Sequence, residues 1–247
     1  MKFTINKKFM SALRSGTKAN SLHEKVLKLD PGFHDAKLIT GTYQYVVGSL
    51  PWAVKVLALF LGHRGNKQKG IRLVHEAMTK GQLVTTDATV LLTLGYGREK
   101  QHAYARELLE KLTGFYPRNY LYRLEIGRSY QREGNRPEAL RVYLDVAKRS
   151  ETGSPGYGRA PLGRLYFEIG TMQLRMNKLD KALASFELSS QQKDTDGLVR
   201  AYARLRRGDI LLQQNHPEQA REEFEQVAAM PYKKPKQQAQ AKLKKLR

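Results

Sequence analysis

Small and aromatic residues recur along this chain at fixed places of a 34-residue frame. In the repeats that begin at Tyr120, Gly163 and Ala201, the eighth place is a glycine, the twentieth an alanine and the twenty-fourth an aromatic residue. These residues are Gly127, Ala139 and Tyr143, then Gly170, Ala182 and Phe186, then Gly208, Ala220 and Phe224. A small residue on one helix that faces a small and an aromatic residue on the next allows the two helices to pack closely. The pattern therefore predicts helical hairpins that stack on one another along the chain.

The segment between the two helices of a hairpin carries turn signals. Gly134, Asn177 and Asn215 all stand at the fifteenth place of their repeats. Glycine and asparagine tolerate the left-handed backbone conformation that ends many helices. Pro137 and Pro217 follow closely, and proline is favoured at the first position of a helix, where its missing N–H costs little. These signals predict where the first helix of a hairpin ends and the second begins.

The frame extends over nearly the whole chain and predicts a single all-α domain. We expect repeats at about 1–33, 34–84, 86–119, 120–153, 163–196 and 201–234, followed by a capping helix at 235–247. The second repeat carries an insert at 49–65, because Gly41 and Gly70 are 29 positions apart where the equivalent pair in other repeats is 12 apart. Pro51 and Gly62 delimit a short additional helix in this insert. The extra residues 153–161 are expected to form a flexible loop between repeats.

The frame resembles the tetratricopeptide repeat, most specifically in the repeats that begin at Tyr120, Gly163 and Ala201. The glycine- and tyrosine-rich run 41–52 and the segment 61–70 are also loosely similar to an inserted hairpin of the inclusion-body-clearance family of tetratricopeptide proteins and its bacterial relatives. The resemblance implies a right-handed superhelical solenoid of about six tetratricopeptide hairpins plus a C-terminal capping helix. It also implies an adaptor or scaffold role, without naming a partner.

In a tetratricopeptide solenoid the first helix of each hairpin lines a concave groove. The groove-lining places hold arginines in successive repeats, together with one aromatic residue: Arg98, Arg128, Arg132, Arg164, Phe167, Arg175 and Arg206. The planar guanidinium of arginine donates paired hydrogen bonds to carboxylate or phosphate. We therefore predict a basic groove that binds an acidic peptide or protein segment, and the alternative is a solvated face of a chain already rich in arginine.

Tetratricopeptide domains that clamp the C-terminal carboxylate of chaperones resemble one another in a lysine at the fifth place and an asparagine at the ninth. Here these places hold Val90 and Leu94 in the repeat that begins at Thr86, and the other repeats lack the pair as well. Binding of a chaperone tail is therefore not predicted.

The charge balance leaves a second function open. Lysine and arginine number 44 against 23 acidic residues, a formal net charge of +21. The C-terminal segment is basic throughout, with Lys233, Lys234, Lys236, Lys242, Lys244, Lys245 and Arg247. Such a balance attracts nucleic acid, anionic lipid or acidic proteins, so the alternative is a nucleic-acid-associated protein that uses the groove and this tail. Aromatic residues do not interleave with the tail lysines beyond Tyr232, so base stacking is not indicated.

The inserted segment from Trp52 to Phe60 is apolar almost all round. A helix of this kind is usually buried, and packing against the first hairpins is the default expectation. The alternative is a docking element for a partner or an anionic membrane surface, through Trp52, Lys55 and Phe60. That alternative makes the chain a peripheral membrane adaptor.

Catalytic signals are weak. Cysteine is absent, which excludes disulfides and thiolate chemistry. The six histidines form no metal-ligand spacing, and Glu222, Glu223 and Glu225 are expected to be surface charges. We therefore predict a non-enzyme without metal or cofactor.

The location of the protein is only indirectly indicated. The first 23 residues contain no acid, which is typical of an organelle transit peptide. The repeat frame, however, extends back into this segment, and the longest apolar stretch, 50–61, is shorter than the roughly 20 residues that span a membrane. A cytoplasmic protein is expected, with organelle targeting as the less favoured alternative.

Overall fold

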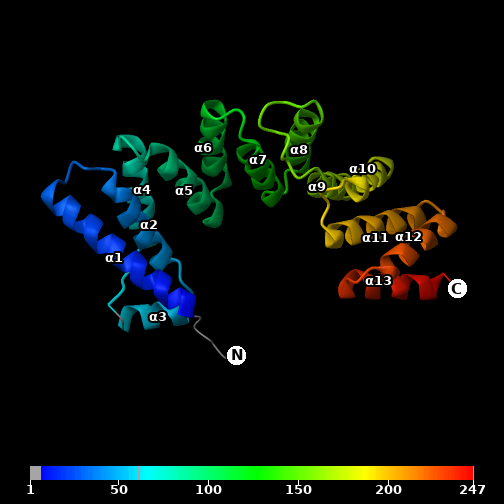
Figure 1. The fold of residues 1–247 in the computed structure, drawn as a ribbon, viewed down its shortest axis with the longest axis horizontal. Coiled ribbons are helices and arrows are strands. Elements are labelled where there is room, and N and C mark those ends of the chain that lie inside the picture. Colours follow the sequence, from blue (N-terminus) through cyan, green and yellow to red (C-terminus); the bar gives the residue numbers. More distant parts are fainter. Residues whose placement is uncertain (1–6, 61, 247) are drawn as a thin grey trace. The chain divides into compact units, whose positions relative to one another are not determined.

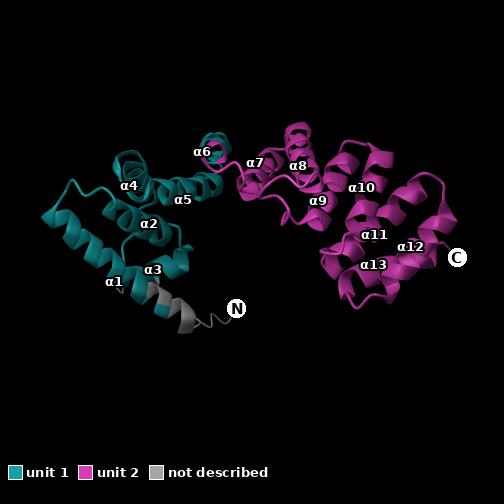
Figure 2. Ribbon diagram, turned by 45° about the horizontal axis from the view of Figure 1, so that its top comes forward, with its two compact units in different colours: residues 1–112 teal, residues 113–247 magenta. Residues whose placement is uncertain are grey.

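The computed structural model describes residues 7–60 and 62–246, and in these residues every regular element is an α-helix. The chain divides into two compact units, residues 1–112 and 113–247 (Figure 2). The helices follow one another in antiparallel pairs within each unit (Figure 1). The all-α class and the series of helical hairpins are therefore confirmed.

Unit 1 contains α1 (Lys7–Leu29), α2 (Ala36–Gly48), α3 (Trp52–Phe60), α4 (Lys67–Lys80), α5 (Thr85–Arg98) and most of α6 (His102–Phe115). Helix α2 pairs with α4, α5 packs on α4, and α1 packs on α2. The short helix α3 stands between the two partners of the α2–α4 hairpin in the sequence, as the repeat frame predicts for an insert.

The first predicted repeat differs from the expectation. Residues 7–29 form one uninterrupted helix and not the hairpin predicted for 1–33. No turn residue interrupts it, since Gly16 is the only glycine in its span and has helical neighbours on both sides. The leading element of the described chain is thus a single long helix that packs on α2.

Unit 2 contains the end of α6 and the helices α7 (Tyr120–Arg132), α8 (Arg136–Glu151), α9 (Leu162–Arg175), α10 (Leu179–Gln191), α11 (Gly197–Gln213), α12 (Pro217–Ala229) and α13 (Lys233–Lys245). The hairpins are α7–α8, α9–α10 and α11–α12, and α13 packs on α12. Leu243 and Leu246 pack against a core cluster that includes Leu205 and Phe224, so the predicted capping helix is confirmed.

The hairpin turns have the predicted backbone. Asn177 and Asn215 have φ of 56° and 60°, and Gly134 has φ of 80°. Proline opens α8 and α12. Lys100 occupies the equivalent place between α5 and α6 with φ of 61°, although lysine gives no sequence signal for a left-handed turn.

The glycines of the frame lie where two helices meet. A Cβ atom on Gly127 would stand 2.3 Å from Cε1 of Tyr143, and one on Gly208 would stand 2.4 Å from Cε1 of Phe224. The third pair, Gly170 and Phe186, has the same arrangement at 2.9 Å. Each aromatic ring therefore covers the backbone of the preceding helix, and only hydrogen leaves room for it.

The same principle holds the interrupted hairpin together. A Cβ atom on Gly41 would stand 2.9 Å from the carbonyl oxygen of Gly70, and one on Gly70 would stand 2.5 Å from the backbone nitrogen of Tyr45. Helices α2 and α4 thus touch backbone to backbone. The insert lengthens their connection without separating them.

The segment 153–161 is anchored rather than loose, which corrects the prediction of a flexible loop. Tyr157 is only 1 % exposed and belongs to the largest core cluster of unit 2. Its ring lies 6.3 Å from the ring of Tyr120, and the guanidinium of Arg149 lies 5.6 Å from the ring centroid. Local composition indicated a turn, but it gave no sign that one tyrosine would fasten the turn to the core.

Candidate functional site

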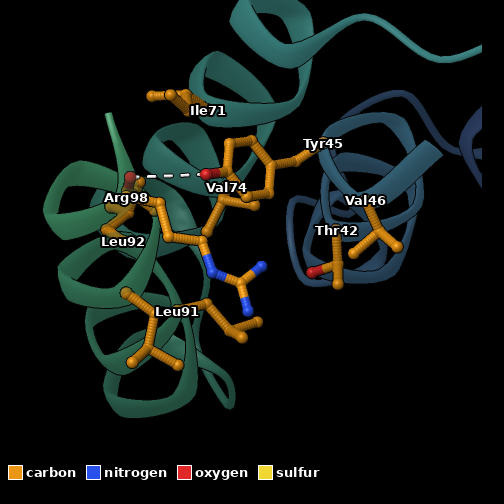
Figure 3. Close-up of a pocket in the computed structure, with 10 residues that line it drawn as sticks. Thr42, Tyr45, Val46, Ile71, Val74, Leu91, Leu92 and Arg98 are labelled. Carbon is orange, nitrogen blue, oxygen red and sulfur yellow. Dashed lines mark hydrogen bonds between the residues drawn. The ribbon is translucent and has the colours of Figure 1, made fainter. Parts of the chain in front are cut away.

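A hollow with an apolar lining lies between α2, α4 and α5 (Figure 3). Its volume is about 180 Å³. The lining is almost wholly apolar apart from Thr42, the Tyr45 hydroxyl and Arg98; the residues are Thr42, Tyr45 and Val46 from α2, Ile71 and Val74 from α4, and Leu91, Leu92, Leu94, Gly95 and Arg98 from α5. We call this hollow the α2–α5 pocket.

Two large apolar side chains stand at the mouth of the α2–α5 pocket rather than in its floor. Val46 and Leu94 are both about half exposed, whereas Val74 and Leu92 are buried. An accessible apolar rim above a buried apolar floor is the arrangement that accepts one bulky side chain of a ligand. Leu94 stands at a groove-lining place of the repeat frame, so the sequence signal for this surface was present.

A polar network closes one side of the pocket. The Tyr45 hydroxyl donates to Oε1 of Glu99 at 3.2 Å and to the carbonyl oxygen of Gly95 at 3.4 Å. Lys67 Nζ donates to the same Oε1 at 2.8 Å. The hydrogen bond from Lys67 lowers the pKa of Glu99 against the opposing effect of burial, and the Tyr45 hydrogen bond adds to the lowering. Glu99 is therefore an ionised carboxylate whose charge Lys67 balances.

Arg98 is the one predicted groove residue in unit 1, and it lines the pocket. Its guanidinium points into the space between α5 and α2, toward Thr42 and Val46 (Figure 3). The neighbouring acid, Glu99, is already held by Lys67. Among the residues that the structure describes, Arg98 has no ion pair. An exposed, unpaired cation thus stands beside an apolar hollow.

The predicted arginines of α7 are paired instead. Glu125 forms ion pairs with Arg128 and, at 4.0 Å, with Arg132. Both guanidinium groups are exposed, and exposed pairs are worth about 0–1 kcal/mol. The pairing nevertheless halves the positive charge of this helix face.

Helix α9 shows the same arrangement. Arg164 pairs with Glu168 at 3.0 Å, and its guanidinium carbon lies 6.0 Å from the ring centroid of Phe167. Glu168 also accepts a hydrogen bond from Gln131 of α7 at 3.3 Å. Phe167 itself packs on Phe186, with ring centroids 5.6 Å apart. The Phe167 ring is therefore partly used in the fold.

The last two predicted groove arginines differ from each other. Arg206 of α11 pairs with Asp209 at 3.5 Å, and the same carboxylate pairs with Lys242 of the capping helix. Arg175, at the end of α9, has no ion pair in the described part of the chain. The seven predicted residues thus comprise one aromatic residue, four paired arginines and two unpaired arginines.

The tail lysines lie on a folded helix. Lys233, Lys234, Lys244 and Lys245 are exposed on α13, and Lys236 is half-buried. Lys242 is engaged with Asp209, and its ammonium nitrogen lies 5.7 Å from the ring centroid of Phe224. Arg247 lies outside the described residues. The cation count available to a ligand is therefore smaller than the sequence suggests.

Glu223 corrects an expectation. This residue is 8 % exposed and pairs with Arg204 at 3.1 Å and with Arg207 at 2.9 Å. Its neighbours Glu222 and Glu225 are exposed, as predicted. Glu223 is thus a structural carboxylate that ties α12 to α11, and sequence reasoning missed it because its two partners lie on another helix.

The inserted helix α3 is exposed. Trp52 and Phe60, at its two ends, are 81 % and 84 % exposed. The default expectation of burial is therefore wrong, and the docking alternative for Trp52, Lys55 and Phe60 stays open. In the described residues, no group of three or more histidine, aspartate or glutamate side chains is placed to hold a metal ion, and no helix there is long and apolar enough to cross a membrane.

No family model matches this sequence, and comparison with curated proteins finds no match. Solved structures do resemble the fold. BtubC from P. vanneervenii is 14 % identical with a TM-score of 0.54, and the match covers 94 % of this chain and 91 % of BtubC. A crystal structure of MamA is 14 % identical with a TM-score of 0.52, covering 75 % of this chain and 95 % of MamA.

Both solved structures are built from tetratricopeptide-type helical hairpins. The fold of this chain is therefore of the tetratricopeptide type, as the repeat frame predicted. Fold similarity at this level of identity carries no partner or ligand across. The looser resemblance of the insert to the inclusion-body-clearance proteins stays a prediction.

Proposed function

We propose that this tetratricopeptide-type chain is a non-catalytic scaffold that binds an acidic segment of a partner protein, with the α2–α5 pocket as its anchor. The observation that carries the proposal is the pairing of an apolar hollow with the exposed, unpaired guanidinium of Arg98. The matching ligand has a bulky apolar side chain next to an aspartate or glutamate. No step of catalysis is required of any residue.

The size of the pocket supports one apolar anchor. An engineered apolar cavity of about 150 Å³ holds a benzene molecule, and the α2–α5 pocket measures about 180 Å³. A phenylalanine or leucine side chain of the ligand fits a space of this size. Burying such a side chain contributes about 1.5–3 kcal/mol, which is typical of a side chain that dominates a peptide interface.

The free charge of Arg98 selects an acidic residue next to the apolar anchor of the ligand. The guanidinium of Arg98 is free to form a bidentate pair with a carboxylate, whereas Arg128, Arg132, Arg164 and Arg206 already have acidic partners. A ligand carboxylate that binds one of these four must displace an internal acid, so the net gain is small. This makes Arg98 the first choice for charge selection within unit 1.

The test is selection of linear peptides from a random display library on the immobilised full-length chain. We expect a consensus with one large apolar residue flanked by acid. The Arg98→Glu variant should lose these peptides by about tenfold or more, which corresponds to about 1.4 kcal/mol. Changing the consensus acid to lysine should restore binding to Arg98→Glu, because the charge pair is then re-formed with reversed sign.

Arg72→Glu is the matched control, because Arg72 is also exposed in unit 1 and lies outside the α2–α5 pocket. It should keep the selected peptides. Equal loss from Arg72→Glu and Arg98→Glu, or a consensus without acid, would contradict the proposal.

The nucleic-acid alternative predicts a different outcome when binding to the chain is tested against salt, nuclease and removal of the tail. Binding through phosphates falls steeply as salt rises, with one counterion released for each contact. If the chain loses its ligand after nuclease treatment, and also after removal of residues 233–247, the nucleic-acid function is favoured. That outcome would count against the peptide scaffold. The exposed lysines Lys233, Lys234, Lys244 and Lys245 would then be the contacts to replace.

A further inference from the structure

Helix α3 presents four large apolar side chains to solvent. Trp52, Val56, Leu59 and Phe60 follow the spacing of one helix face, and their exposed fractions are 81 %, 45 %, 52 % and 84 %. Residues at i, i+4, i+7 and i+8 share one side of an α-helix. The helix therefore carries a continuous apolar face that the described residues, 7–60 and 62–246, leave uncovered.

Other side chains on α3 and just after it fasten the helix to unit 1. Ala58 is buried, with only 3 % of its surface exposed. Lys55 Nζ donates to the carbonyl oxygen of Gly48 at 3.3 Å. After the helix, His63 Nδ1 lies within hydrogen-bonding distance of the hydroxyls of Tyr43 and Thr17, at 3.1 Å and 3.3 Å. A small buried side chain and polar contacts thus hold the helix, whereas Trp52, Val56, Leu59 and Phe60 remain exposed.

The sequence on either side of α3 is basic and free of acids. From residue 36 to residue 75 the sequence contains no aspartate or glutamate. Lys55 on α3 and Arg64 shortly after it in the sequence are exposed. Helix α1, which reaches His63 through Thr17, adds the exposed residues Arg14 and Lys18. Figure 1 shows α1 and α3 as neighbours.

We propose that α3 is an interfacial anchor that lies flat on an anionic membrane surface, with Trp52, Val56, Leu59 and Phe60 inserted at the level of the lipid headgroups. Apolar residues on one face with lysine and arginine around it are the features of such anchors, and tryptophan favours the membrane interface. Each nearby lysine or arginine contributes about 1 kcal/mol of attraction to an anionic leaflet. This goes beyond the peptide scaffold and uses none of its residues.

An apolar face alone would fit a protein partner as well as a lipid surface. The acid-free sequence around α3 favours lipid, because an anionic leaflet presents one sign of charge throughout. The length of α3 also fits, since a helix of nine residues is about 13 Å long. A helix of this size lies in the interface and does not span it.

The chain supplies its own reporter, because Trp52 is its only tryptophan. The experiment measures tryptophan emission of the full-length protein with vesicles of phosphatidylserine and phosphatidylcholine, and with vesicles of phosphatidylcholine alone. We expect the emission to move to shorter wavelength, and to be protected from acrylamide, with the anionic vesicles only. Sedimentation with the vesicles gives the partition coefficient.

Two variants test the surface while keeping the reporter. Phe60→Ala should lower the partition coefficient roughly tenfold or more, because a fully inserted aromatic ring is removed. Phe115→Ala is the matched control, since Phe115 also ends a helix and is 79 % exposed; it should leave partitioning unchanged. The double variant Lys55→Glu and Arg64→Glu should reduce the preference for anionic vesicles.

Three outcomes would overturn the proposal. The first is an unchanged emission spectrum with anionic vesicles. The second is equal binding to neutral and anionic vesicles, which would remove the role of Lys55 and Arg64. The third is a spectral shift that follows protein concentration without lipid, which would mean that a second copy of the chain covers the face.

Discussion

Replacing Gly127 by alanine tests the packing rule on which the whole fold rests. The added Cβ would stand 2.3 Å from Cε1 of Tyr143, where ordinary contacts begin at 3.4 Å. The ring must therefore withdraw by about 1 Å. Tyr143 is 2 % exposed, and its hydroxyl donates to Gln131 Oε1 at 2.8 Å. A ring that is enclosed and tied at its far end has little freedom to move.

The expected magnitude follows from two opposing effects. Overpacking a well-filled core costs about 1–3 kcal/mol, and loss of the Tyr143 hydrogen bond adds about 1 kcal/mol. Alanine in place of glycine gains up to about 1 kcal/mol of helix propensity. We expect Gly127→Ala to lower the free energy of unfolding by about 1–3 kcal/mol. Gly97→Ala, where a Cβ meets nothing within 4 Å, should be neutral or stabilising.

Urea unfolding, followed by circular dichroism, measures the free energy of unfolding of both variants. A helical-repeat chain can unfold in stages, and hydrogen exchange of α7 and α8 then shows whether the loss is local to this hairpin. The double variant Gly127→Ala with Tyr143→Leu should be less unstable than the sum of the single changes. The repeat that begins at Thr86 already combines a larger residue, Thr93, with Leu109 at these two places. Additive effects, or stabilisation by Gly127→Ala alone, would refute the reasoning.

Three further predictions concern the ties between helices. Glu223→Gln removes the charge that balances two partly buried arginines and should cost about 3 kcal/mol by urea unfolding. Glu222→Gln at its exposed neighbour should change stability by less than about 0.5 kcal/mol, and similar losses for the two variants would contradict the assigned role. Tyr157→Ala should cost about 3–5 kcal/mol and open the segment 153–161 to proteolysis, while Tyr157→Phe should keep it protected. The pKa of Glu99 is held below its ordinary value of 4.5, chiefly by the hydrogen bond from Lys67, so its stabilisation is present above pH 4.5 and is lost as the pH falls further. Lys67→Gln should weaken this part of the acid dependence of the melting temperature, and an unchanged acid profile would count against it.

The mixed charge of the predicted groove has a consequence for partners. Glu125, Glu168 and Asp209 place negative charge among the arginines of unit 2. A ligand that follows these helices meets pairs of both signs, so a uniformly acidic peptide gains little there. Under the proposed function, selectivity for acid therefore rests on the arginines without an ion pair among the described residues, Arg98 and Arg175.

The sequence by itself determined the helical hairpins, their turns and their contact points. These features are local and periodic: a glycine, an alanine and an aromatic residue at fixed spacing, or an asparagine at a helix end, act through the same few neighbours in every repeat. The glycines at 127, 170 and 208 all lie under an aromatic ring as expected. The insert was also predicted, because it lengthens the spacing between Gly41 and Gly70 from the 12 positions of other repeats to 29.

Only the tertiary structure decided which side chains are available for function. The burial of Glu223 and the anchoring of Tyr157 depend on groups that reach them from other helices. The composition of α3 alone predicted burial. Its exposure depends on which other elements of the fold pack against it. Periodicity fixes which face of a helix a residue occupies. Whether a charged side chain is unpaired, or an apolar side chain exposed, depends on the groups from other elements that pack against that face. The linear pattern does not contain this information.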